Sequence, residues 1–179
     1  MNIWHDISPD RIKEEDFITV IEVPKGSRKK YEIDKETGLI KLDRILQTSV
    51  QYPSNYGFIP RTLSEDGDAL DVLVMCSESI TPHTLVRCRP LGYIEMIDNG
   101  VRDEKVIAVI RKDPYYLDYD DIFQLPAFMV KEVEHFLSVY KALDKRAATE
   151  VRPIQGKAEA MRVIRRSLER YNKEFGLKQ

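Results

Sequence analysis

The sequence is poor in cysteine: among its 179 residues there are only Cys76 and Cys88, too few for a disulfide scaffold. The two do not form a metal-binding pair, so a reducing compartment is the simplest expectation. The first ten residues show no basic stretch followed by an apolar run, and no segment is long and apolar enough to span a bilayer. We therefore expect a cytoplasmic protein with no membrane partner.

Motifs for nucleotide binding and for covalent catalysis are also missing. The chain has no Walker-type glycine loop, no G-x-G-x-x-G and no G-x-S-x-G, and its three histidines lack zinc-ligand spacing. The net charge is -2, whereas proteins that coat nucleic acid usually carry a basic excess. We expect no nucleic-acid partner, and metal-activated water is the natural nucleophile if the protein is an enzyme.

The first two thirds of the chain read as short strands separated by turn residues. Strands are expected at residues 17–23, 30–34, 39–45, 72–76, 85–96 and 105–110, with turns at residues 35–38 and 99–100. Helical periodicity then follows Pro126, where the apolar stripe consists of Met129, Val133, Phe136, Leu137 and Tyr140. A second helix is expected after Gly156, with Gly176 placed to cap it and an apolar stripe of Met161, Ile164, Leu168, Tyr171 and Phe175. This order predicts one α+β domain over residues 1–179: a small, mostly antiparallel β-barrel with two C-terminal helices packed outside.

An acidic segment carries the strongest chemical signal. Glu65, Asp66, Asp68 and Asp71 lie within seven residues and run directly into an apolar strand. Acids packed this closely repel each other unless solvent or a cation screens them. Gly67 permits a tight bend that brings several oxygens together, and magnesium prefers a few carboxylates plus waters and phosphate oxygens. The segment therefore favours a magnesium site.

Other interpretations of these patterns compete with a metal site. An Asp-Gly-Asp tripeptide by itself is more often a solvated acidic turn. An EF-hand calcium loop is excluded, because its fifth, sixth and twelfth positions would be Leu70, Asp71 and Ser77. Small barrels also serve as nucleic-acid or partner-binding modules, but the arginines of the last helix alternate with an apolar stripe and resemble a solvated face.

Two charged residues occupy apolar strand faces. Glu22 shares a face with Ile18 and Val20, and Arg44 has a similar position on the strand at residues 39–45. A carboxylate on such a face usually has a partner, although Glu22 could also lie wet at the end of its strand. Near the end of the first helix, Tyr140 falls on the apolar stripe, so we expect it in the core with Lys141 facing solvent.

The central motif, Asp66-Gly67-Asp68-Ala69-Leu70-Asp71-Val72, combines an Asp-x-Asp-x-x-Asp segment with a following strand. With its flanking landmarks, the chain resembles the soluble family I inorganic pyrophosphatases from about Phe17 through the last helix. The landmarks occur in order: Ile21-Glu22-Val23-Pro24, Lys30-Tyr31-Glu32-Ile33-Asp34, Leu42-Asp43-Arg44, Tyr52-Pro53-Ser54-Asn55-Tyr56-Gly57, Arg87-Cys88-Arg89-Pro90-Leu91-Gly92, Asp98 with Asp103 and Lys105, and Tyr140-Lys141. Ala69 departs from the usual Pro, and Asn99 stands where an acid is common.

The resemblance implies hydrolysis of pyrophosphate to two phosphates by a Mg2+-activated water, with Asp68 as general base. It implies metal-binding or metal-supporting roles for Asp66, Asp71, Asp98, Asp103, Glu22 and Glu32. It implies substrate contacts for Lys30, Arg44, Tyr56, Lys105, Tyr140 and Lys141. It also implies a five-stranded barrel of the OB type and a homo-oligomer, a hexamer as in short bacterial members. A phosphohydrolase of nucleotides or other phosphoesters is the alternative within enzymes.

Overall fold

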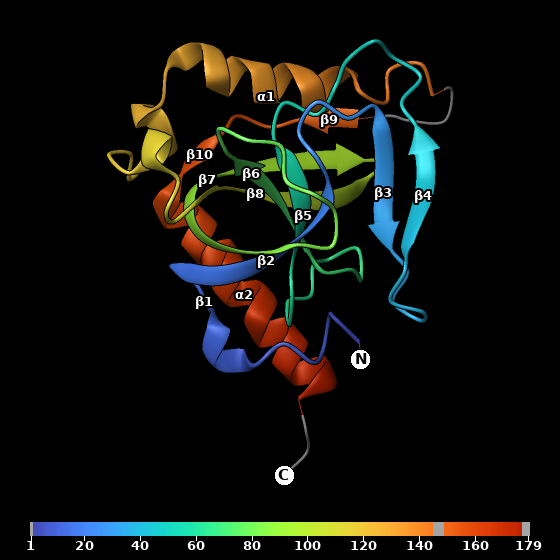
Figure 1. Ribbon diagram of the computed structural model, residues 1–179, viewed down its shortest axis with the longest axis vertical. Helices are drawn as coiled ribbons and strands as arrows, with labels where there is room; N and C mark the ends of the chain where they lie inside the picture. Colours follow the sequence, from blue (N-terminus) through green and yellow to red (C-terminus); the bar gives the residue numbers. More distant parts are fainter. Residues whose placement is uncertain (1, 145–148, 177–179) are drawn as a thin grey trace.

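The computed structural model describes residues 2–144 and 149–176 of the chain (Figure 1). The α-helices are α1 (Ala127–Val139) and α2 (Lys157–Phe175), and short 3-10 turns occur at Pro9–Arg11, Pro114–Tyr116 and Ile122–Gln124. The strands are β1 (Ile12–Lys13), β2 (Asp16–Val23), β3 (Lys29–Ile33), β4 (Ile40–Ile45), β5 (Asn55–Ile59), β6 (Leu70–Met75), β7 (Leu85–Asp98), β8 (Val101–Ile110), β9 (Thr149–Val151) and β10 (Gln155–Gly156).

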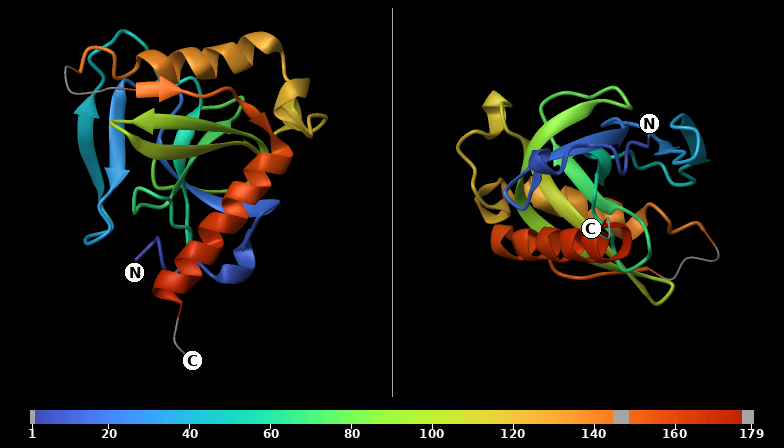
Figure 2. Two further views of the ribbon diagram at one scale, coloured as in Figure 1. Left: turned by 180° about the vertical axis from the view of Figure 1, so that it is seen from behind. Right: turned by 90° about the horizontal axis from the view of Figure 1, so that it is seen from below.

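Five strands pair in a closed ring, in the order β2, β5, β6, β8 and β7, with β7 pairing back to β2. Four of these pairings are antiparallel, and the pairing of β6 with β8 is parallel. Figures 1 and 2 show α1 lying across one end of the ring and α2 running diagonally along its outside. The expected α+β organisation, a mostly antiparallel set of strands with two helices outside, is confirmed at this level.

Strand β5 was not expected, because its sequence follows Pro53-Ser54 and contains Gly57, which are features of a loop. The strand is buried along its whole length, so it shows no alternation of apolar and polar residues. Gly57 is required here: a Cβ atom at this position would lie 1.8 Å from the carbonyl oxygen of Val20 on β2. A glycine that suggests a turn in the sequence thus allows two strands of the ring to approach closely.

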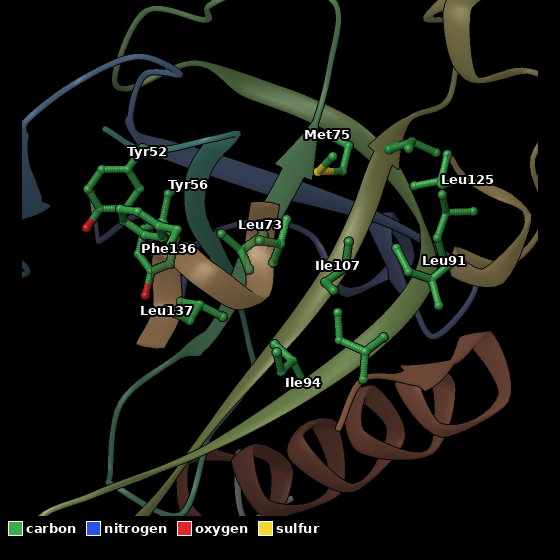
Figure 3. Close-up of a cluster of buried hydrophobic side chains, with 14 of the residues drawn as sticks. Tyr52, Tyr56, Leu73, Met75, Leu91, Ile94, Ile107, Leu125, Phe136 and Leu137 are labelled. Carbon is green, nitrogen blue, oxygen red and sulfur yellow. The ribbon is translucent and has the colours of Figure 1, made fainter. Parts of the chain in front are cut away.

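The ring interior beneath α1 is filled with apolar side chains, shown in Figure 3. Leu73, Ile94 and Ile107 contribute from three strands of the ring, while Phe136 and Leu137 pack onto them from α1. Each of these side chains is nearly or completely buried. The helical periodicity after Pro126 therefore predicted the correct face of α1.

The buried face of α2 differs from the expected stripe of Met161, Ile164, Leu168, Tyr171 and Phe175. Its fully buried residues are Ala160, Val163, Ile164, Ser167 and Tyr171. Small residues allow the helix to lie close to the strands, a criterion that hydrophobicity alone does not capture. Gly176 ends the helix as expected, but its φ of -57° is not the left-handed cap. Neither helix, within the described residues, is long and apolar enough to cross a membrane.

Strands β3 and β4 form a separate two-stranded hairpin that stands beside the ring (Figure 1). Their turn contains Gly38 at φ +73°, the left-handed position that the sequence indicated. The expected turn between β7 and β8 is also confirmed, with Asn99 at φ +49° and Gly100 at φ +83°.

Candidate active site

A cavity of about 470 Å3 lies between one end of the ring, the β3–β4 hairpin and the end of α1. All of the predicted site residues line this cavity except Arg44. None of its lining residues, within the described part of the chain, is a serine, cysteine or histidine. The cavity therefore offers carboxylates, ammonium groups and phenols rather than a protein nucleophile of the serine or cysteine type.

Lys105 is the centre of the wall formed by β6 and β8. It lies opposite Asp71 in the parallel pairing of these strands, and Asp103 is two residues earlier, on the same face. The Lys105 ammonium group lies 2.7 Å from Asp71 Oδ2 and 2.9 Å from Asp103 Oδ1, and it donates to Tyr56 Oη at 3.0 Å. Only 3% of the side chain is exposed.

Burial and charge act in opposite directions on Lys105. Burial alone would lower its pKa, but the Asp103 and Asp71 carboxylates outweigh this effect and hold the pKa well above its usual value. The neighbouring phenol of Tyr56 is buried, which raises its pKa well above the usual value and keeps it protonated. This wall therefore presents a fixed positive charge, two carboxylates and a neutral hydroxyl.

The acidic loop, residues 64–69, enters β6 through a tight turn. Gly67 takes a φ of +88°, and the backbone N–H of Asp68 donates to Asp66 Oδ1 at 3.0 Å. Burial raises the pKa of Asp66 to about 6, and the carboxylates of Asp71 and Asp103 add to the effect. The Asp68 side chain is 60% exposed and forms an ion pair with Lys35. The loop thus contributes one crowded and one accessible carboxylate to the cavity.

Glu22 connects the ring to the hairpin. Its carboxylate, on β2, accepts the backbone N–H of Ile33 on β3 at 2.8 Å, and only 8% of the residue is exposed. Burial raises the pKa of Glu22 to about 8, and Asp71 and Glu32 raise it further, against the effect of the Ile33 N–H. The alternative of a wet carboxylate at a strand end is therefore wrong.

The hairpin contributes Lys30 and Glu32 to the cavity. Lys30 Nζ lies 2.7 Å from Glu32 Oε1 and 3.3 Å from Asp43 Oδ2. Arg44 does not reach the main cavity: its Nε donates to Asp43 Oδ2 at 2.8 Å, and the residue lines a smaller adjoining hollow of about 50 Å3. Arg44 therefore has a carboxylate partner, as its strand position predicted, but lies at the margin of the site.

Tyr140 and Lys141 complete the cavity from the end of α1. Tyr140 is buried and stacks on Phe136 with 5.0 Å between ring centroids, so the core position is confirmed. Lys141 forms an ion pair with Asp98 of β7 and lines both the cavity and the hollow beside Arg44. The expectation that Lys141 faces solvent by default is wrong, because Asp98 draws its ammonium group inward.

Several cavity residues were not predicted from the sequence: Asp34, Lys35, Lys41 and Tyr52. Lys35 is the first residue of the hairpin turn, and Lys30 and Glu32 precede it on β3. A turn that continues a strand with site residues is the one signal that could have identified Lys35. Its orientation depends on contacts with distant segments, which local sequence does not reveal.

The donor set suits a hard divalent cation, because eight carboxylates from four segments of the chain surround one cavity. Burial raises the pKa of Asp66, the carboxylates of Asp71 and Asp103 raise it further, and a cation would relieve that repulsion. In the described residues no three metal-ligating side chains converge closely enough to hold an ion. Lysine ammonium groups pair with these carboxylates, as Lys105 does with Asp71 and Asp103.

The chain is similar along most of its length to proteins of one family. The family model described as Inorganic pyrophosphatase matches residues 19–172. Soluble inorganic pyrophosphatase 2 of Chlamydomonas reinhardtii is 44% identical over 96% of this chain and 89% of its own length. Inorganic pyrophosphatase of Aquifex pyrophilus is 42% identical over 95% and 97%, respectively. The solved inorganic pyrophosphatase of Thermus thermophilus superimposes with a TM-score of 0.88 at 38% identity, covering 96% of this chain and 99% of that one.

Proposed function

This chain belongs to the inorganic pyrophosphatase family and is an inorganic diphosphatase, and we propose roles for its site residues. The reaction is the hydrolysis of pyrophosphate to two phosphates. The observation that carries the assignment is that carboxylates and ammonium groups line the same cavity of about 470 Å3. Such a site can bind a polyanion while it activates a water molecule.

We propose Mg2+ as the cofactor, held by Asp66, Asp71, Asp98 and Asp103 with support from Glu22 and Glu32. When bound, magnesium neutralises phosphate charge and lowers the pKa of water. Asp68 is the general base that accepts the proton of the attacking water. Its carboxylate is the accessible one of the acidic loop, with 60% of the side chain exposed. An exposed carboxylate can accept a proton and release it to solvent.

The substrate is held by cations and phenols from three directions. Lys30 approaches from the hairpin, Lys105 with Tyr56 from the ring, and Lys141 with Tyr140 from the end of α1. Arg44 grips a phosphate at the margin of the cavity, where its guanidinium adjoins Lys141. In phosphoryl transfer the protein mainly positions groups and stabilises charge, which matches this arrangement.

We further propose that the closed ring is a barrel of the OB type and that residues 1–179 form one pyrophosphatase domain. Five ring strands with a single parallel pairing support the first point. We also propose a cytoplasmic homo-oligomer, a hexamer by resemblance. Exposed apolar residues such as Leu42 and Phe128 leave surface that subunit contacts would cover. Sedimentation velocity on the full chain tests the hexamer, and a monomer peak would refute it.

Phosphate release from pyrophosphate by the purified chain tests the function directly. We expect fast release with magnesium, loss of release with chelator, and little release from ATP. Equal rates with ATP would favour the broader phosphohydrolase alternative. Absence of release with every divalent metal would mean that the acidic loop has a structural role.

A further inference from the structure

The hairpin turn carries a lysine into the cavity that none of the roles above uses. Lys35 lines the cavity, and its side chain is 32% exposed. Its ammonium group forms an ion pair with the carboxylate of Asp68, which joins the hairpin to the acidic loop. The carboxylates of Glu22, Asp71 and Asp66 also attract this ammonium group. Lys35 therefore places a positive charge among the carboxylates of the site.

A buried tryptophan from the N-terminal segment supports Lys35. The Lys35 ammonium group lies 4.3 Å from the centroid of the Trp4 ring, within the range of a cation–π interaction. Asn2 Nδ2 donates to the backbone carbonyl of Lys35 at 3.4 Å. Figure 1 and the left view of Figure 2 show the N-terminal segment next to the turn of the β3–β4 hairpin.

Trp4 is itself fixed to the segment that leads into the site. Its indole N–H donates to the carbonyl oxygen of Thr62 at 2.9 Å. The hydroxyl of Thr62 accepts the backbone N–H of Leu70 at 2.8 Å, at the first residue of β6. The platform beneath Lys35 and the strand that follows Asp68 are therefore held by one hydrogen-bonded connection. This connection links the residue that contacts the lysine to the strand that follows the base.

We propose that Lys35 is a further pyrophosphate-binding residue, positioned by Trp4, which pairs with Asp68 only until substrate binds. The inference rests on the proposed function of Asp68 as the base. Pyrophosphate carries several negative charges near neutral pH and competes with a single carboxylate for the ammonium group. When Lys35 turns to the substrate, the Asp68 carboxylate is free to accept the proton of the attacking water. Substrate binding thereby releases the base.

Steady-state kinetics on Lys35→Met tests the substrate contact. The change keeps the aliphatic stem and removes the charge, so we expect KM for pyrophosphate to rise roughly tenfold with kcat little changed. Lys35→Arg keeps the charge and should restore most of the affinity. Lys29→Met is the matched control, since Lys29 lies exposed on β3, the strand that leads to the Lys35 turn, and outside the cavity lining. Equal KM values for Lys35→Met and Lys29→Met would overturn the proposal.

Failure of the proposed function gives a different result, because the wild type and Lys29→Met would then both release no phosphate. Trp4 supplies a second readout, because it is the only tryptophan of the chain and lies against the Lys35 ammonium group. We expect inorganic phosphate, the product, to change the tryptophan emission of the wild type in the presence of magnesium. The change should be lost in Lys35→Met. The same change in both proteins, or none in the wild type, would refute the role of Lys35.

Discussion

The two sides of the cavity are built on different scaffolds. We call one the ring side, which consists of Asp66, Asp68, Asp71, Asp103 and Lys105. We call the other the hairpin side, which consists of Lys30, Glu32, Lys35 and Arg44. Strand β6 and most of β8 are buried, whereas every residue of β4 is half-buried or exposed. The strands that carry Asp71, Asp103 and Lys105 are therefore fixed by packing on several faces, and the turn with Asp66 and Asp68 leads directly into one of them. The hairpin side is held mainly by its own two strands.

This difference matches the chemistry that each side performs. Metal binding needs oxygens at fixed positions, which the buried strands β6 and β8 provide for Asp71 and Asp103, while the tight turn before β6 holds Asp66 and the accessible base Asp68. Holding a polyanion needs positive charge more than precise geometry, and a half-exposed hairpin can supply it. Ring-side changes should therefore lower turnover or stability, while hairpin-side changes should mainly weaken substrate binding. Each prediction below tests that division.

The largest effect is expected for Asp68→Asn on the ring side. The amide keeps the size of the side chain but cannot accept the proton, so kcat should fall by roughly a hundred- to ten-thousand-fold. Fold and metal binding should be retained. Phosphate release measures kcat, and circular dichroism measures retention of the fold. The control is Asp118→Asn, which changes an exposed acid outside the cavity lining. Near-wild-type turnover would remove Asp68 from the role of base.

The second prediction compares Lys105→Met with Lys30→Met in protein without divalent metal. Lys105 is almost completely buried between two carboxylates, so its removal leaves them uncompensated and should cost about 3 to 5 kcal/mol of unfolding free energy. Lys30 is more exposed, and solvent can reach its partners Glu32 and Asp43, so its loss should cost about 1 kcal/mol or less. Urea denaturation measures both values. Equal costs would show that the two sides are equally rigid.

Much of the ring side could be predicted from the sequence, because its signals are local. The close spacing of Asp66, Asp68 and Asp71 before an apolar strand indicates a site. The Asn99-Gly100 turn indicates that β7 and β8 pair, which places Asp98 opposite the start of β8. The resemblance to a family then supplied their roles. The ring as a whole was harder to predict, since β5 contains Gly57 and is buried on both faces, so neither alternation nor composition identifies it.

The hairpin side was less predictable for a physical reason. Lys35 lies in the site because Trp4, Thr62 and Asp68 hold it there, and these residues are distant in sequence or belong to another element. For Arg44, the strand position was predicted correctly but the position of the side chain was not. Its guanidinium donates to the neighbouring Asp43 and stays at the margin of the cavity.

Glu22, at the junction of the two sides, gives the third prediction. Its pKa is raised to about 8 by burial, so the folded protein binds the proton more tightly than the unfolded chain does. Between about pH 4.5 and 8 the folded state holds more protons, and stability falls as pH rises through this window. Glu22→Gln cannot ionise and can still accept the Ile33 N–H. Without metal, it should exceed the wild type in stability by about 1 to 3 kcal/mol above pH 8.

Thermal unfolding at several pH values in chelator measures this effect, and the two proteins should converge below about pH 4.5, where the Glu22 carboxyl is neutral in both the folded and the unfolded state. Glu150→Gln is the matched control, because the Glu150 side chain is 61% exposed and pairs only with a neighbouring arginine among the contacts described. If Glu22→Gln followed the wild-type pH curve throughout, the carboxylate would be hydrated and the junction between ring and hairpin looser than the structure indicates.

The smallest effect is expected for Lys141→Ala. This change tests whether a lysine outside the ring side contributes to substrate binding without contributing to turnover. Lys141 lines the same hollow as Arg44 and pairs with Asp98, so its ammonium group can hold a phosphate oxygen without touching Asp68. KM for pyrophosphate should rise roughly fivefold to tenfold with kcat nearly unchanged. Lys131→Ala, at an exposed position of α1, the helix that ends just before Lys141, is the control. A loss confined to kcat would instead place Lys141 with the ring side, acting on the metal-binding Asp98.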